Sequence, residues 1–322
     1  MRALPTINVI LPTRDRPAPL AEALRSVLAQ RLAPEEIVVV DDGGRGEAAR
    51  VVTGLWGGAP PSADGRSTIA VVEGPGRGPG AARNAGLRLA TGELVAFLDD
   101  DDMWHPEKLA LQAPWFARAP SLGVLGTGRV MAGEGASAGP SAALSVNVGT
   151  LALQGRRGRI RRVPLRAMVR ANELVTSSVM ARRERLQECG GFDESLPLAQ
   201  DWDLWLRLAQ RTEVAVLAEP LVCYRRHGGQ RSAEVMAMRS WEGEVLRRAL
   251  ARGLPANVQG IARRRLAWSH VRLGRLLARA GETELAREEF GKAMALCRCN
   301  PAAWVGVMRC ALGKRALARA RT

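Results

Sequence analysis

The sequence has no long hydrophobic run. None of its 322 residues lies in a stretch that approaches the roughly 18 consecutive apolar residues of a membrane-spanning helix. Residues 1–6 hold one arginine and no apolar segment of the kind that a secretory signal peptide carries. These absences disfavour transmembrane and secreted proteins, and we expect a protein that stays in the cytoplasm or docks on the inner face of a membrane.

Cysteine is also scarce. The five cysteines are odd in number and lack the paired spacing of a structural zinc site. Cys297 and Cys299 form one close pair, but no second pair accompanies them. Reduced, buried thiols are the favoured interpretation for a cytoplasmic protein.

Lysine is scarce beside arginine. Lys108, Lys292 and Lys314 are the only lysines among 47 Lys and Arg, and this bias indicates genome-wide composition rather than a function for each arginine. The net charge of +15 is uneven, because residues 236–322 carry 18 Lys and Arg against 6 Asp and Glu. We expect this basic region to pack on the main domain or to meet an anionic membrane surface, and we disfavour nucleic acid as its partner.

The first 100 residues alternate strand and helix signals. Short apolar runs predict strands, and amphipathic stretches between them predict helices. Because such repeats form parallel sheets that are covered on both faces, the expected fold class is α/β. The predicted strands are 7–11, 36–40, 68–72 and 94–98, and the predicted helices are 19–30, 49–55 and 81–90. Later strands are predicted at 122–131 and 175–180, and a later helix at 201–210.

The chain has a purely helical pattern after Ser232. Residues 273–301 resemble one tetratricopeptide repeat, in which two antiparallel helices pack closely. One repeat cannot bury its own apolar face, so it must pack on the main domain or on a partner. We therefore predict two domains, residues 1–235 and a basic helical region at 236–322 with one tetratricopeptide-like helix pair.

Four consecutive aspartates, Asp99 to Asp102, follow the predicted strand 94–98. Acids at the carboxyl end of a strand lie where open α/β sheets bind ligands. Adjacent carboxylates repel one another unless some are protonated or a cation lies among them. An acidic turn that caps the next helix would explain one or two of these residues but not four. Hard oxygen ligands favour magnesium or manganese over zinc, so we expect a divalent metal site.

Two other segments lie near the same predicted sheet edge. Asp41–Asp42 follows the strand 36–40, although this pair alone is typical of a plain turn. The glycine-rich segment 74–80 superficially resembles a dinucleotide fingerprint, but its two prolines remove backbone donors that a pyrophosphate would need. We reject an NAD site and expect the following helix to bring Arg83 and Asn84 to the ligand edge.

Asp201 is the candidate catalytic group of the segment 200–205. It is either the N-cap of a helix or a general base beside a tryptophan on which a sugar ring stacks. On a helix, Asp203 would point in a different direction from Asp201. We therefore expect that one of these two acids is catalytic and the other structural.

The segment 224–232 gathers cations around one histidine. His227 is either structural, as lone histidines usually are, or a metal ligand near a diphosphate. The candidates for contact with the acceptor or a diphosphate are Trp104, Trp202, Arg226 and Arg231.

Together these motifs resemble those of family 2 glycosyltransferases with the GT-A fold, over residues 5–235. That fold implies a Rossmann-like, mostly parallel sheet between helices. The resemblance rests on the order and spacing of residues 7–15, 38–43, 82–86, 90–93, 97–106, 200–205 and 224–227.

The resemblance implies an inverting transfer of a sugar from a nucleoside-diphosphate sugar to a hydroxyl acceptor, in glycan or lipid-linked glycan assembly. Asp99 and Asp101 would form the Asp-x-Asp motif of the family, with Asp99 toward the ribose and Asp101 on Mn²⁺ or Mg²⁺. Asp201 would deprotonate the acceptor hydroxyl. The implied nucleotide-sugar-binding residues are Pro12, Thr13, Arg14, Asp42, Arg83, Asp99 and Asp100.

The sequence departs from the family pattern at two positions. Arg14 stands where the family more often has tyrosine, which leaves the nucleotide open, and Gln200 stands where it more often has glutamate. Two alternatives are kept: a nucleotidyltransferase of similar fold, and a non-catalytic adaptor that uses the basic helical tail. Neither the donor sugar nor the oligomeric state is indicated by the sequence.

Overall fold

The computed structural model describes residues 4–56, 67–132, 158–225, 235–297 and 301–319, with side chains described as far as residue 310. The chain forms two compact units. The first unit comprises Met1–Pro164 and Asn172–Gly228, and the second comprises Leu165–Ala171 and Gly229–Thr322. The second unit therefore includes one short segment, Leu165–Ala171, that lies within the first domain predicted from the sequence, residues 1–235.

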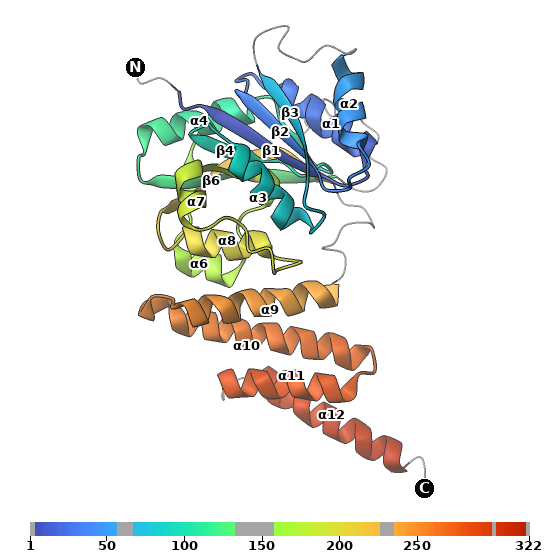
Figure 1. The fold of residues 1–322 in the computed structure, drawn as a ribbon. Helices are drawn as coiled ribbons and strands as arrows, with labels where there is room; N and C mark the ends of the chain where they lie inside the picture. Colours follow the sequence, from blue (N-terminus) through green and yellow to red (C-terminus); the bar gives the residue numbers. More distant parts are fainter. Residues whose placement is uncertain (1–3, 57–66, 133–157, 226–234, 298–300, 320–322) are drawn as a thin grey trace. The chain divides into compact units, whose positions relative to one another are not determined.

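The first unit is built on a nine-stranded mixed sheet (Figure 1). Its first half has the strand order β3-β2-β1-β4, and all neighbours in it run parallel. This half consists of β1 (Ile7–Thr13), β2 (Glu36–Asp41), β3 (Thr68–Glu73) and β4 (Leu94–Phe97). The alternating pattern of the first 100 residues thus predicted the elements and their parallel pairing, and the α/β fold class is confirmed.

The second half of the sheet mixes the two strand directions. The short strand β8 (Met180–Arg182) pairs antiparallel with both β4 and β6 (Leu122–Ala132). The long strand β9 (Glu213–Arg225) runs parallel to β6 and antiparallel to β5 (Met103–Trp104) and β7 (Ile160–Arg162). No strand was predicted from the sequence for the segment of β9.

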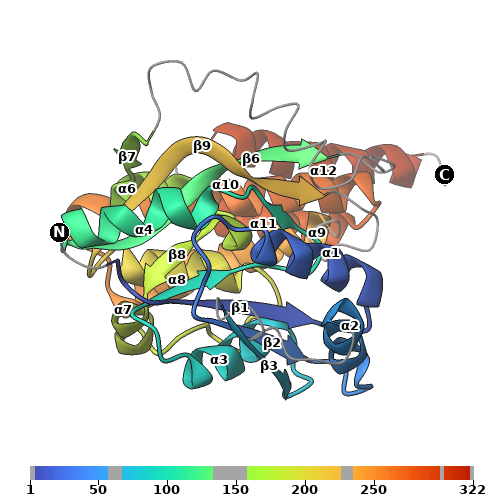
Figure 2. The same cartoon turned by 90° about the horizontal axis from the view of Figure 1, so that it is seen from above.

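Helices cover both faces of this sheet (Figures 1 and 2). One face packs on α1 (Pro17–Leu28), α2 (Glu47–Trp56) and α4 (Lys108–Arg118), through alternate strand residues such as Val39 and Ala96. The opposite face packs on α3 (Pro79–Leu89) through Val38 and Val40. Phe97 extends this second face with Phe192 and with Trp205 of α8 (Gln200–Leu208), at ring-centroid distances of 5.3 and 6.4 Å.

The strand predicted at 175–180 is wrong for most of its length. Thr176–Ser178 forms a 3₁₀ turn, η2, and β8 begins only at Met180. The Ser178 hydroxyl donates a hydrogen bond to the carbonyl oxygen of Val175 at 2.7 Å. Serine and threonine side chains compete in this way for backbone groups, which favours a turn over an extended strand. The helix α7 (Arg183–Glu188) follows directly.

The second unit is helical. It contains α6 (Leu165–Arg170), α9 (Val235–Arg252), α10 (Ala256–Arg279), α11 (Thr283–Leu296) and α12 (Pro301–Arg319). The ring of Phe290 on α11 is buried, and a Cβ added at Gly274 or Gly306 would lie 2.9 or 2.5 Å from its Cε1 atom. The two glycines therefore let α10 and α12 approach α11 closely. No described helix is long and apolar enough to cross a membrane.

Candidate active site at the carboxyl edge of the sheet

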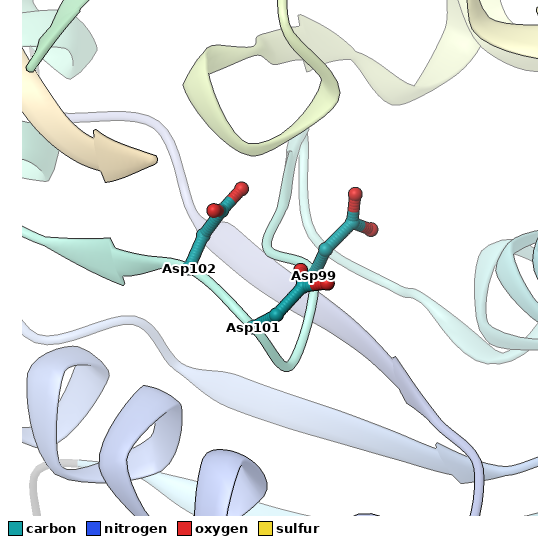
Figure 3. A group of neighbouring side chains, drawn as sticks. All are labelled: Asp99, Asp101 and Asp102. Carbon is teal, nitrogen blue, oxygen red and sulfur yellow. The ribbon is translucent and has the colours of Figure 1, made fainter. Parts of the chain in front are cut away.

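The acidic turn lies where β4 ends, at the carboxyl edge of the parallel strands. Asp102 N donates to the carbonyl oxygen of Asp99 at 3.0 Å, which closes the turn before β5 begins. Figure 3 shows three carboxylates on this turn, those of Asp99, Asp101 and Asp102, and one oxygen of each lies within 4.8 Å of the others. The structure thus brings the two acids of the predicted Asp-x-Asp motif together with a third.

These three carboxylates fit a divalent cation. Among the described residues no cysteine or histidine belongs to the group, so its donors are all hard oxygens, which suit Mn²⁺ or Mg²⁺. Burial raises the pKa of Asp102 well above its ordinary value, and the negative charges of Asp101 and Asp99 raise it further. A bound cation would relieve this repulsion and keep the three groups ionised.

Asp100 does not belong to this group of three carboxylates. Its carboxylate accepts a hydrogen bond from the Thr13 hydroxyl at 2.7 Å and pairs with Arg16 at 2.5 Å. Burial raises the pKa of Asp100 to about 6, although Arg16 and the Thr13 hydroxyl favour the ionised form. Arg16 also reaches Asp101 at 3.1 Å. Asp100 therefore ties the end of β1 to the acidic turn.

Arg83 supplies a positive charge beside the carboxylates. It is almost fully buried on α3 and forms an ion pair with Asp99. Its guanidinium carbon lies 5.3 Å from the centre of the Phe192 ring, and its Nε has no hydrogen-bond partner among the described residues. Arg83 also lowers the pKa of Asp201, whereas Asp99 raises it, so these three charged groups act on one another across one site.

Asp201 lies in the first turn of α8, after Ala199, whose positive φ of 57° directs the chain into the helix. Its carboxylate accepts hydrogen bonds from Asn172 at 2.9 Å and from the Thr176 hydroxyl at 3.5 Å. Burial raises the pKa of Asp201, more than the hydrogen bond from Trp202 N, the charge of Arg83 and the hydrogen bond from Asn172 lower it. A raised pKa makes the ionised carboxylate a better proton acceptor, as a general base requires. It is not the N-cap residue, which is Ala199.

Asp203 has a different environment on the same helix. It is buried and accepts a hydrogen bond from Arg207 Nε at 2.9 Å. Arg207 in turn donates to the carbonyl oxygens of Cys189 and Gly191. Asp203 therefore holds α8 to the preceding loop through Arg207.

The two tryptophans proposed to contact acceptor or diphosphate are core residues. Trp104 and Trp202 are 1% and 2% exposed. The Trp104 indole donates to the carbonyl oxygen of Ser177 at 2.7 Å, and Lys108 Nζ lies 4.0 Å from the centre of its ring. Neither ring offers a free face for a sugar, so the assignment of both as contact residues is wrong.

The residues proposed for the base and ribose pocket lie at the ends of β1 and β2. Pro12 and Thr13 are buried, and Asp42 N donates to the Thr13 carbonyl oxygen at 2.8 Å. Both carboxylate oxygens of Asp42 accept backbone hydrogen bonds, from Gly76 at 2.8 Å and Gly78 at 2.9 Å. Asp42 therefore fixes the glycine-rich segment. Arg14 follows β1 and is exposed.

Three predicted residues, Arg226, His227 and Arg231, lie outside the described residues. Arg225 directly precedes Arg226 and belongs to the motif at residues 224–227. Its guanidinium forms an ion pair with Glu22 and donates to the carbonyl oxygen of Asp101 at 2.5 Å.

The sequence reasoning also missed Arg16, Asn172 and Ser177. Arg16 could have been predicted from its position just after β1, because a positive charge there would offset the negative charge of the four aspartates at the same edge of the sheet. Asn172 and Ser177 carry no local signal, since their partners lie 29 and up to 78 residues away along the chain.

Known proteins resemble this chain in sequence and in fold. A glycosyltransferase of Nostoc sp. named alr2836, which is uncharacterized, is 40% identical over 119 residues, 37% of this chain and 35% of that protein. The chain thus spans about a third of the length of this relative. The structure of S. aureus TarS in complex with UDP-GlcNAc has a TM-score of 0.62 and 20% identity, with 90% of this chain and 81% of that chain covered.

A second solved structure is the mannosyltransferase PcManGT from Pyrobaculum calidifontis in complex with GDP-Man and Mn²⁺. It has a TM-score of 0.59 and 22% identity, and the match covers 96% of this chain and 81% of that chain. At these identities the two structures show a shared fold. The model of glycosyl transferase family 2 matches residues 8–165, and that of glycosyltransferase like family 2 matches residues 165–257. The chain therefore belongs to glycosyltransferase family 2.

Proposed function

We propose that this protein is an inverting, metal-dependent glycosyltransferase that moves a sugar from a nucleoside-diphosphate sugar to a hydroxyl acceptor. The observation that carries the proposal is the convergence of Asp99, Asp101 and Asp102 at the carboxyl edge of the sheet, with Arg83 linking them to Asp201. Two fold neighbours whose structures contain UDP-GlcNAc, or GDP-Man with Mn²⁺, support a nucleotide sugar as donor.

Each charged group has a role in this proposal. A divalent cation held by the three aspartates would offset the negative charge that develops on the departing nucleoside diphosphate. Arg83 adds a fixed positive charge beside Asp99. Asp201 takes the proton of the acceptor hydroxyl, which is a poor nucleophile until it is deprotonated. One base and one displacement suffice, and a single in-line displacement inverts the anomeric carbon.

A panel of sugar nucleotides tests the proposal. The full-length chain is incubated with UDP- and GDP-sugars, with Mn²⁺ or with a chelator, and the released products are identified. We expect free nucleoside diphosphate from one donor class, in the presence of Mn²⁺ only. Release of pyrophosphate with formation of a sugar nucleotide would instead identify a nucleotidyltransferase. A chain that turns over no donor and binds a protein partner tightly would be an adaptor.

We further propose a cytoplasmic protein that acts in cell-envelope glycan assembly on glycan or lipid-linked acceptors and contacts the anionic inner face of the membrane. The positive charge of residues 236–322 supports this contact. On α12, Trp304, Val305 and Met308 are exposed next to Arg309, and the helix contains no acidic residue. Basic helices with exposed apolar residues bind membrane interfaces. Flotation with anionic vesicles but not with neutral ones would support the contact.

A further inference from the structure

Ser177 touches both ends of the acidic turn. This residue of η2 is fully buried in the first unit. Its hydroxyl accepts a hydrogen bond from Asp99 N at 3.1 Å and donates one to the Asp102 carboxylate at 2.5 Å. Its carbonyl oxygen accepts the bond from the Trp104 indole at 2.7 Å. One residue thus bonds to the first and last aspartates of the turn and to the strand that follows.

These contacts fix the orientation of the hydroxyl. A serine hydroxyl can donate one hydrogen bond. Because the backbone N–H of Asp99 donates to the Ser177 oxygen, the hydroxyl hydrogen is directed to the Asp102 carboxylate. The other Asp102 oxygen accepts a hydrogen bond from Arg225 N at 3.3 Å. Both oxygens of this buried carboxylate are therefore held by groups from outside the turn, at fixed positions.

The neighbouring residues of the same segment bond to the candidate base. Asn172 and the Thr176 hydroxyl contact the Asp201 carboxylate, whereas Ser177 contacts the acidic turn. Residues 172–178 therefore connect the two halves of the site. Because Ser177 does not bond to Asp201, a substitution at Ser177 should alter the acidic turn and leave the hydrogen bonds of Asp201 in place.

We propose that Ser177 is a positioning residue that holds Asp99, Asp101 and Asp102 in the arrangement that takes up a divalent cation. The inference rests on the proposed metal-dependent function. Carboxylates that bind metals depend on hydrogen bonds from surrounding groups to keep their orientation. Without the Ser177 hydroxyl, the Asp102 carboxylate loses its shorter hydrogen bond and Asp99 N loses its acceptor, so two of the contacts that fix the acidic turn are removed.

The test is a direct measurement of Mn²⁺ binding. Free Mn²⁺ is followed by electron paramagnetic resonance as the ion is titrated into the full-length chain, alone and with uridine or guanosine diphosphate. We expect Ser177→Ala to weaken Mn²⁺ binding by roughly 10- to 100-fold, the usual range for groups that orient metal ligands. Donor turnover should require correspondingly more Mn²⁺ for half-maximal rate.

Ser178→Ala is the matched control. Ser178 is the next residue of the same turn and is equally buried, but its hydroxyl donates to the Val175 carbonyl oxygen. Its Mn²⁺ affinity should equal that of the parent, even where both variants lose thermal stability. Equal affinity of Ser177→Ala and the parent would overturn the inference, as would an equal loss in both variants.

Ser177→Cys covers the case in which Ser177→Ala does not fold. A thiol keeps the size of the side chain and a weak donor, so its Mn²⁺ affinity should fall below that of the parent. An unchanged affinity would again overturn the inference. If the parent itself does not bind Mn²⁺, both the metal-dependent function and this inference are refuted. If the parent and the variant bind Mn²⁺ equally well, only the inference is refuted.

Discussion

Replacing Asp201 by asparagine should stop sugar transfer while leaving the fold intact. The substitution keeps the shape of the side chain and removes its ability to take a proton. A positioned general base contributes roughly 10²- to 10⁴-fold to a rate, which corresponds to about 3–5 kcal/mol of activation free energy. The stability change should be small, because burial already disfavours the ionised form of Asp201 and a neutral side chain avoids that cost.

Asp203→Asn is the matched control on the same helix. Asp203 pairs with Arg207, which is bonded to two loop carbonyls, and this pair is mostly buried. Removing one partner of a buried ion pair lowers the free energy of unfolding by roughly 3–5 kcal/mol. Because Arg207 is partly exposed, we expect a loss at the lower end of this range. We therefore expect Asp203→Asn to lower the melting temperature and Asp201→Asn to lower the turnover number.

The assay measures turnover of the best donor across pH, alongside thermal unfolding and nucleotide binding. In the parent, turnover should rise with pH as Asp201 loses its proton, and the raised pKa of Asp201 moves this rise above the range of an ordinary aspartate. In Asp201→Asn the residual rate should lose that rise, and nucleoside diphosphate should bind as in the parent. Normal turnover in a folded Asp201→Asn variant would show that Asp201 is not the base.

Three further outcomes are expected. Asp101→Asn should abolish metal-dependent nucleotide binding in calorimetry, since it removes one of three converging carboxylates; retained Mn²⁺ dependence would contradict the metal assignment. With a chelator present, the unfolding free energy of the parent should fall by about 2 kcal/mol relative to Asp100→Asn as pH rises from about 4 to 6. The unfolding free energy falls because burial raises the pKa of Asp100 from 3.8 to about 6, so that between these pH values the folded state binds the proton more tightly than the unfolded state. Denaturant titrations in which the difference in unfolding free energy between parent and variant does not change with pH would refute this prediction. Gly274→Ala should destabilise the second unit by roughly 1–3 kcal/mol, because the new Cβ would lie 2.9 Å from the Phe290 ring; full hydrogen-exchange protection of α11 in this variant would count against the packing.

Local patterns in the sequence predicted the first half of the sheet well. The strands β1, β2 and β4 are fully or largely buried, so their apolar runs are continuous and easily recognised. The strand β9 was missed because Glu219 and Pro220 interrupt its apolar pattern, and its pairing with β6 contains register shifts nearby. The turn at η2 was missed because its shape depends on serine hydroxyls that bond to backbone groups.

The residues of the candidate site could be predicted from the sequence where they lie close together in one segment of the chain. Asp99 and Asp101 were proposed as site residues because the acidic turn directly follows a recognisable strand, and the structure brings their carboxylates together. Trp104 was misassigned because a tryptophan beside acids suggests a stacking surface, whereas its indole donates to a carbonyl oxygen brought in from η2. A single sequence shows no such pairings between distant segments, and Ser177 was missed for the same reason.

The burial of Lys108 has a practical consequence. Its ammonium group is enclosed between the Trp104 ring and Gln112, and burial lowers its pKa well below that of an ordinary lysine. Lys292 is exposed, and Lys314 also belongs to the second unit. Lysine-directed dyes should therefore modify Lys292 of the helical unit and spare Lys108, which is the one lysine in the sequence of the first unit.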